Sequence, residues 1–134
     1  MMRFTLLAVL FLVASVRADD APREIVMEAK KVDGAVHWLP AKVEVTQGEK
    51  LKIVAKWDEE GGFDFHGLFI PVLKVTTQVD RHKAKELEVT VPKTLKAGEY
   101  KIGCQFHEKH VPATLVVKAA PKTTAKAVPA PKAN

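Results

Sequence analysis

Short runs of alternating apolar and polar residues fill the middle of the chain. In residues 41–50, Val43 and Val45 fall on one side of a two-residue period and Glu44 on the other, before a turn at residues 47–49. This period is typical of half-buried β-strands. The runs expected to form strands cover residues 24–32, 41–50, 51–57, 63–73, 85–91, 99–104 and 113–118. A weak helical period occurs only near Val79–Leu87.

The spacing of these runs predicts an all-β fold. Strands about 8–12 residues apart, separated by Gly and Pro, are typical of an antiparallel sandwich or a small barrel. A domain of about 100 residues buries enough apolar surface to fold without a disulfide or a metal. A bound metal is therefore expected to be functional and not the main source of folding energy.

The two ends of the chain differ from this middle part. Residues 1–18 have a basic start, an apolar stretch and a small residue before Asp19, as in a secretory signal peptide; an uncleaved anchor is the alternative. The apolar stretch is shorter than the roughly 20 residues of a membrane-spanning helix. Residues 119–134 contain mainly Ala, Pro, Lys and Thr, which predicts a flexible tail. We therefore expect an exported protein, secreted or periplasmic, with one domain over residues 19–118 and no stable membrane insertion after cleavage.

The net charge does not indicate a nucleic-acid partner. The formal charge of the whole chain is +5, but six of its basic residues lie in the signal-like segment and from Lys118 onward. Without them the remaining chain is close to neutral. A basic surface for nucleic acid is not expected.

The segment CQFHEKH carries the strongest chemical signal. Cys104 is the only cysteine, and His107 and His110 follow it within one short loop. A lone cysteine cannot form an internal disulfide, and its ordinary interpretation is a small core residue, largely buried at the end of a strand. Thiolate and imidazole together, however, suit copper or zinc. His66 in FDFHGLFI is the candidate from a distant strand, which would complete the His₂Cys set of mononuclear copper sites.

Three segments resemble the cupredoxins, copper-binding Greek-key β-sandwiches of the plastocyanin and azurin type. They are WLPAKVEVTQGEKLKIVAK, FHGLFI and AGEYKIGCQFHEKHVPATLVVK, in this order. The resemblance covers most of residues 25–118. It implies one copper ion per chain, with His66, Cys104 and His107 as equatorial ligands.

The ligand loop departs from the family pattern in one place. Most cupredoxins have an axial Met after the second His, whereas this chain has His110, at a spacing similar to that of amicyanin. The loop also resembles that of nitrosocyanin, a red copper protein with a Glu ligand, but Glu60 ranks below His66. Imidazole in place of thioether should lower the reduction potential and shift the site from blue towards green or red. Phe65, Phe69 and Phe106 are expected to shield the sulfur from water.

Four functions follow from these features. The first is one-electron transfer to a redox partner protein, through a histidine ringed by apolar residues that include Leu68, Val111 and Pro112. The second is copper binding or delivery with a copper-trafficking partner. The third is catalysis at an open coordination position, so the question of enzymatic activity stays open, and the fourth is a metal-free module. His37 and His82 are weaker ligand candidates.

Overall fold

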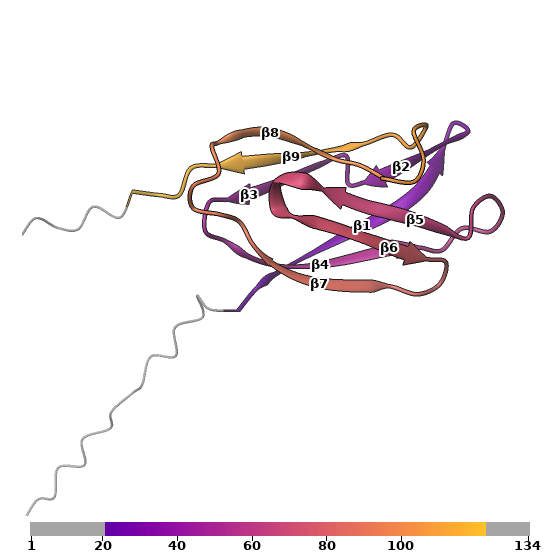
Figure 1. Ribbon diagram of the computed structural model, residues 1–134, viewed down its shortest axis with the longest axis horizontal. Helices are drawn as coiled ribbons and strands as arrows, with labels where there is room; N and C mark the ends of the chain where they lie inside the picture. The colour runs from indigo at the N-terminus through magenta and orange to yellow at the C-terminus, as the bar shows by residue number, and fades with distance from the viewer. Residues whose placement is uncertain (1–20, 123–134) are drawn as a thin grey trace, which may run out of the picture.

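A computed structural model describes residues 21–122, and within them the chain forms nine strands and one 3-10 turn (Figure 1). The elements are β1 (Arg23–Val32), β2 (Ala35–Leu39), β3 (Lys42–Thr46), β4 (Lys50–Trp57), β5 (Phe65–Ile70), η2 (Pro71–Leu73), β6 (Val75–Asp80), β7 (Lys85–Thr90), β8 (Gly98–Ile102) and β9 (Ala113–Lys118). The expected all-β fold is confirmed. The signal-like residues 1–18 and most of the expected tail lie outside the described part of the chain. Residues 21–122 contain no helix long and apolar enough to cross a membrane.

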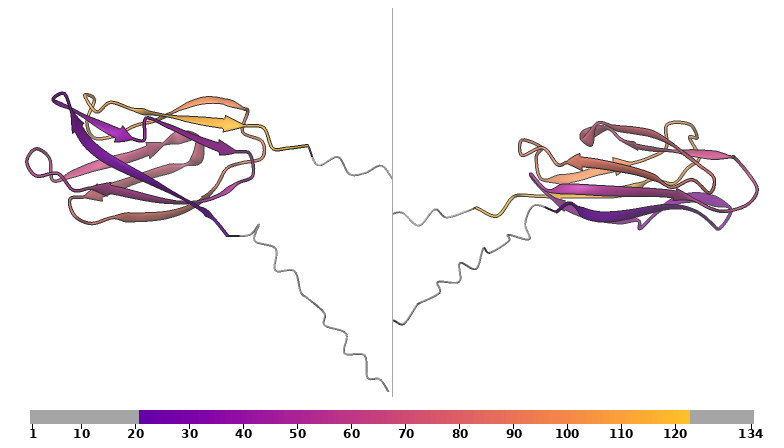
Figure 2. Two further views of the ribbon diagram at one scale, coloured as in Figure 1. Left: turned by 180° about the vertical axis from the view of Figure 1, so that it is seen from behind. Right: turned by 90° about the horizontal axis from the view of Figure 1, so that it is seen from below.

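The strands form two facing layers (Figure 2). One layer has the order β2-β1-β4-β7, and the other combines β3-β9-β8 with the pair β5-β6. A bridge between Phe69 and Gly103 joins β5 to the end of β8. The sheets are not purely antiparallel as expected, because β1 pairs with β4 and β3 with β9 in parallel.

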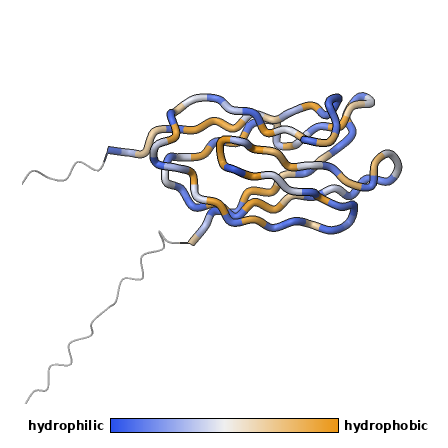
Figure 3. The backbone as a smooth tube through the Cα atoms, viewed as in Figure 1, coloured by the Kyte–Doolittle hydropathy of each residue, from blue (hydrophilic) through white to orange (hydrophobic). Residues whose placement is uncertain are grey.

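Apolar residues of both layers meet in one core. Along the strands, apolar and polar positions alternate (Figure 3). Val43 and Val45 are buried and Glu44 is exposed, as the two-residue period predicts. In β4 the period fails at Val54, which is buried although it lies on the opposite face from Ile53. The reason is that β4 is an inner strand with neighbours on both sides.

Two strands were not predicted from the pattern. β2 follows β1 through a tight turn in which Asp33 and Gly34 both have positive φ angles, of 49° and 80°. β6 continues from the apolar run of β5 after a turn at η2. The weak helical period near Val79–Leu87 does not correspond to a helix. β6 ends at Asp80, and a turn in which His82 has a φ angle of 60° leads into β7.

Candidate metal centre

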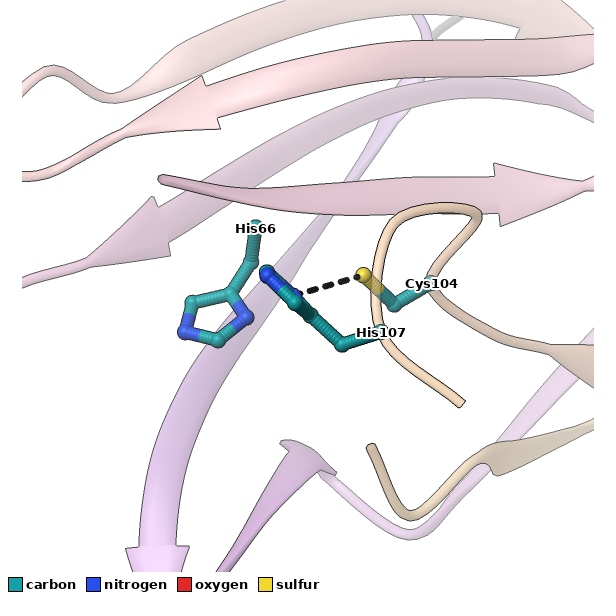
Figure 4. Close-up of side chains that lie close together, drawn as sticks. All are labelled: His66, Cys104 and His107. Atoms are coloured by element: carbon teal, nitrogen blue, oxygen red, sulfur yellow. Dashed lines mark hydrogen bonds between the residues drawn. The ribbon is translucent and has the colours of Figure 1, made fainter. Parts of the chain in front are cut away.

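The side chains of His66, Cys104 and His107 lie close together (Figure 4). His66 lies on β5, and the other two belong to the loop between β8 and β9. One potential ligand atom from each residue lies within 4.8 Å of the other two. The structure thus brings His66 next to two residues that lie about forty positions further along the sequence.

His66 is a buried imidazole without hydrogen bonds. Its exposed fraction is 1%, and neither ring nitrogen has a partner among the described residues. Trp57 contacts the ring edge-on, with ring centroids 4.3 Å apart. Burial, the largest cause, together with the neighbouring His110 and His107 lowers the pKa of His66 from 6.5 to about 4. A buried polar group without a partner requires an explanation, and the binding of an ion is one of the usual ones.

Cys104 is held by the strand that carries His66. Its Sγ accepts the backbone N–H of Gly67 at 3.1 Å and lies 3.6 Å from Nδ1 of His107. The Gly67 N–H thus holds the sulfur, the metal-binding atom of a cysteine, next to the imidazole of His107. The expectation of a largely buried cysteine is wrong, because Cys104 is only partly buried. It lies in the loop beyond β8, which ends at Ile102.

His107 lies under an aromatic cover that differs from the expected one. Phe63 stacks on its ring, with centroids 3.9 Å apart, although sequence reasoning did not select this residue. Phe63 is 59% exposed and Phe106 is 45% exposed, so Phe106 does not give the expected shield from water. Leu68 is fully buried and cannot form part of a surface patch.

His110 is buried beside the cluster but is not part of it. Its exposed fraction is 7%, and its Nε2 has no hydrogen-bond partner within residues 21–122. Its ring centroid is 5.1 Å from that of His66 and 5.4 Å from that of Trp38. Burial lowers the pKa of His110, whereas the carbonyl of Val111 near Nδ1 acts in the opposite direction. Its free nitrogen makes His110 the candidate for a fourth donor.

The weaker candidates lie outside the cluster. Glu60 lies 2.6 Å from Nε2 of His82, and its side chain is 78% exposed. This contact lowers the pKa of Glu60. His37 belongs to β2, where it pairs with Lys30 of β1. The preference for His66 over Glu60 therefore agrees with the geometry.

A cavity of about 300 Å³ opens beside the cluster. His66, His107 and His110 line it together with Phe63, Lys109 and the backbone turn at residues 34–36. Sequence reasoning gave no indication of this cavity, because the turn before β2 was not recognised. The cavity thus lies against the two buried imidazoles, His66 and His110.

Comparison with protein families gives a match to the cupredoxin-like domain over residues 3–117. The chain belongs to the cupredoxin-like family. The resemblance stated from the sequence is therefore confirmed. In this cupredoxin-like chain, His66, Cys104 and His107 form a His₂Cys cluster. No curated protein matches the chain significantly.

Solved structures with a similar fold include copper proteins. The copper nitrite reductase from Nitrosomonas europaea matches with a TM-score of 0.61 at 13% identity, over 81% of this chain and 45% of that chain. A chain from the mixed disulfide between a thioredoxin-like protein and subunit II of cytochrome c oxidase matches with a TM-score of 0.54 at 13% identity. The match covers 81% of this chain and 89% of that chain. A chain of a heme-copper terminal oxidase matches with a TM-score of 0.51 at 13% identity, over 78% of this chain and 68% of that chain. At this identity the matches show the fold alone.

Proposed function

We propose that this protein is an exported copper-binding protein that transfers single electrons. The observation that carries the proposal is the meeting of one thiol and two imidazoles within 4.8 Å, where neither nitrogen of the buried His66 has a hydrogen-bond partner in residues 21–122. His66, Cys104 and His107 would hold one copper ion. Copper in such a site supplies the Cu(I)/Cu(II) couple. Copper is preferred over zinc because its divalent ion binds nitrogen and sulfur donors more strongly.

His110 is proposed as the fourth donor, in the place where most cupredoxins have methionine. Its Nε2 is buried and unpartnered within the described domain, and its ring lies next to His66. Imidazole is a stronger donor than a thioether and stabilises Cu(II). The potential should therefore be lower, and the colour less blue, than with methionine at this position.

Electron transfer is favoured by how the donors are held. His66 lies on a strand, and the Gly67 N–H fixes the sulfur of Cys104 without a metal. A prepared site changes little between two oxidation states. The partly exposed His107, with Phe63 stacked on it, gives a short path to a redox partner. Small apolar contact surfaces suit such transient encounters.

Export follows from the proposed processing of the chain. Residues 1–18 would act as a signal peptide, residues 19–118 form the copper domain, and residues 119–134 remain as a tail. An oxidising compartment suits a protein whose single cysteine is committed to a metal. Mass spectrometry of the mature protein tests the predicted cleavage after Ala18.

Voltammetry of the copper-loaded protein tests the electron-transfer function. We expect a reversible one-electron wave and fast self-exchange between the Cu(I) and Cu(II) forms. An irreversible wave would contradict the proposal. Rapid loss of copper to a mild chelator would favour delivery to a copper-trafficking partner instead.

The cavity beside the histidines favours a second candidate, a copper site with an open position for catalysis. A closed electron-transfer site has no need of a space of about 300 Å³ next to its ligands. Adding azide to the Cu(II) protein tests this possibility. A changed EPR signal would support an exchangeable position, and an unchanged signal would leave electron transfer as the better interpretation.

A further inference from the structure

Trp38 connects the two segments that carry the distant ligands. This residue of β2 is 1% exposed, and its indole Nε1–H donates to two carbonyl oxygens at once. The acceptors are Gly67 and Gly103, each at 3.1 Å. Gly67 directly follows His66, and Gly103 directly precedes Cys104.

The indole lies where the pairing between these segments ends. Phe69 and Gly103 exchange two backbone hydrogen bonds, of 2.9 and 2.8 Å. Beyond this bridge the segments separate, and the next link between them is the Gly67 N–H to the sulfur of Cys104. The indole N–H joins the two carbonyls across this separation, and it therefore controls how far His66 lies from Cys104.

Trp38 also contacts the loop that carries the other donors. Its backbone N–H donates to the carbonyl of Val111 at 3.3 Å, and the Val111 N–H donates to the carbonyl of Val36 at 2.7 Å. The indole ring packs against His110 at 5.4 Å between centroids. One buried side chain thus contacts the backbone or ring beside three of the four candidate donors.

We propose that Trp38 is a positioning residue that sets the separation of His66 and Cys104 and fixes the ring of His110. The proposal rests on the proposed function, because it concerns the same copper site. Residues that orient metal ligands without binding the metal commonly contribute about 10–100-fold to metal affinity.

Trp57 provides a matched control. It is also 1% exposed and also contacts a candidate ligand, His66, but its indole N–H donates to the carbonyl of Phe63 in a loop. Trp38→Phe and Trp57→Phe therefore each remove one buried indole N–H next to the site. Only the first removes the link between the two ligand-bearing segments.

The test compares these variants in the copper-loaded and the metal-free protein. We expect Trp38→Phe to lose about 10–100-fold in Cu(II) affinity and to change the sulfur-to-copper absorption band and the EPR hyperfine splitting. Trp57→Phe should lose less than about threefold and keep the wild-type spectrum. Without metal, the thiol of Cys104 should react about tenfold faster with a disulfide reagent in Trp38→Phe only, since losing the N–H that is shared between two carbonyl oxygens corresponds to about a tenfold change in an equilibrium constant.

An isosteric replacement separates positioning from simple packing. The chain has two tryptophans. In the Trp57→Phe background, biosynthetic incorporation of benzothienylalanine therefore changes position 38 alone and replaces its N–H by sulfur. We expect the same losses as in Trp38→Phe, although the size and shape of the ring, and with them its packing, are preserved.

Equal losses in both phenylalanine variants, or wild-type affinity, spectrum and thiol reactivity with benzothienylalanine, would overturn the proposal. If the wild-type protein showed no copper–sulfur band at all, the proposed function would fail. The thiol reactivity of the metal-free variants would still decide whether Trp38 positions Cys104.

Discussion

The stability of the metal-free protein should fall steeply in mild acid because His66 is buried in its neutral form. Its pKa is about 4 in the folded protein against 6.5 for an ordinary imidazole. The unfolded chain therefore binds a proton at pH values where the folded chain does not. The contribution of His66 is complete above pH 6.5 and is lost as the pH falls towards 4.

The expected loss follows from this difference in pKa. Each unit of difference corresponds to about 1.4 kcal/mol, so His66 alone should lower the free energy of unfolding by about 3 kcal/mol once the pH is below 4. Between pH 7 and pH 5 the loss should be about 2 kcal/mol. This is a large fraction of the roughly 5–15 kcal/mol that stabilises a typical domain. The lowered pKa of His110 adds to the loss with the same sign.

Urea unfolding of the metal-free protein at a series of pH values measures this effect. In His66→Gln, which cannot titrate at this position, the loss between pH 7 and pH 5 should be smaller than in wild type by about 2 kcal/mol. His82→Gln is the control, because His82 is exposed, pairs with Asp58 and Glu60, and is not part of the cluster. The same pH dependence in wild type and His66→Gln would refute the reasoning.

Two further predictions concern residues beside the cluster. His110→Met should shift the visible spectrum of the copper protein towards blue and raise its potential, because a thioether stabilises Cu(II) less than an imidazole; an unchanged spectrum would show that residue 110 does not bind. Gly67→Ala should destabilise the fold by about 1–2 kcal/mol in urea unfolding, because its methyl group would collide with the Gln105 carboxamide and break the bond from Gln105 to the Thr77 carbonyl. The same substitution in a Gln105→Ala background should cost much less, and an equal cost there would contradict this explanation.

Much of the fold could be predicted from the sequence because most strands have one buried and one exposed face. Val43 and Val45 against Glu44 are an example of a pattern that identifies both the strand and its orientation. The pattern fails in β2, where only Trp38 is fully buried and the other residues are half-buried. Such a strand has no clear two-residue period. Its presence could have been inferred only from the turn at Asp33-Gly34.

The metal-binding residue types of the candidate site could be predicted from the sequence. Cysteine and histidine are rare enough in this chain that their spacing identified the cluster of His66, Cys104 and His107. The surroundings were not predictable, because they depend on tertiary contacts. The stacking of Phe63 on His107 and the two hydrogen bonds of the Trp38 indole join segments that no local pattern connects.

The most direct test of copper binding by Cys104 is the absorption and EPR spectrum of the copper-loaded protein beside that of Cys104→Ser. Wild-type protein should take up one copper per chain and show an intense visible band from sulfur-to-copper charge transfer. The band should disappear in Cys104→Ser, where serine offers no sulfur. A copper-loaded wild type without this band, or one with the same spectrum as Cys104→Ser, would contradict a copper site built on the thiolate.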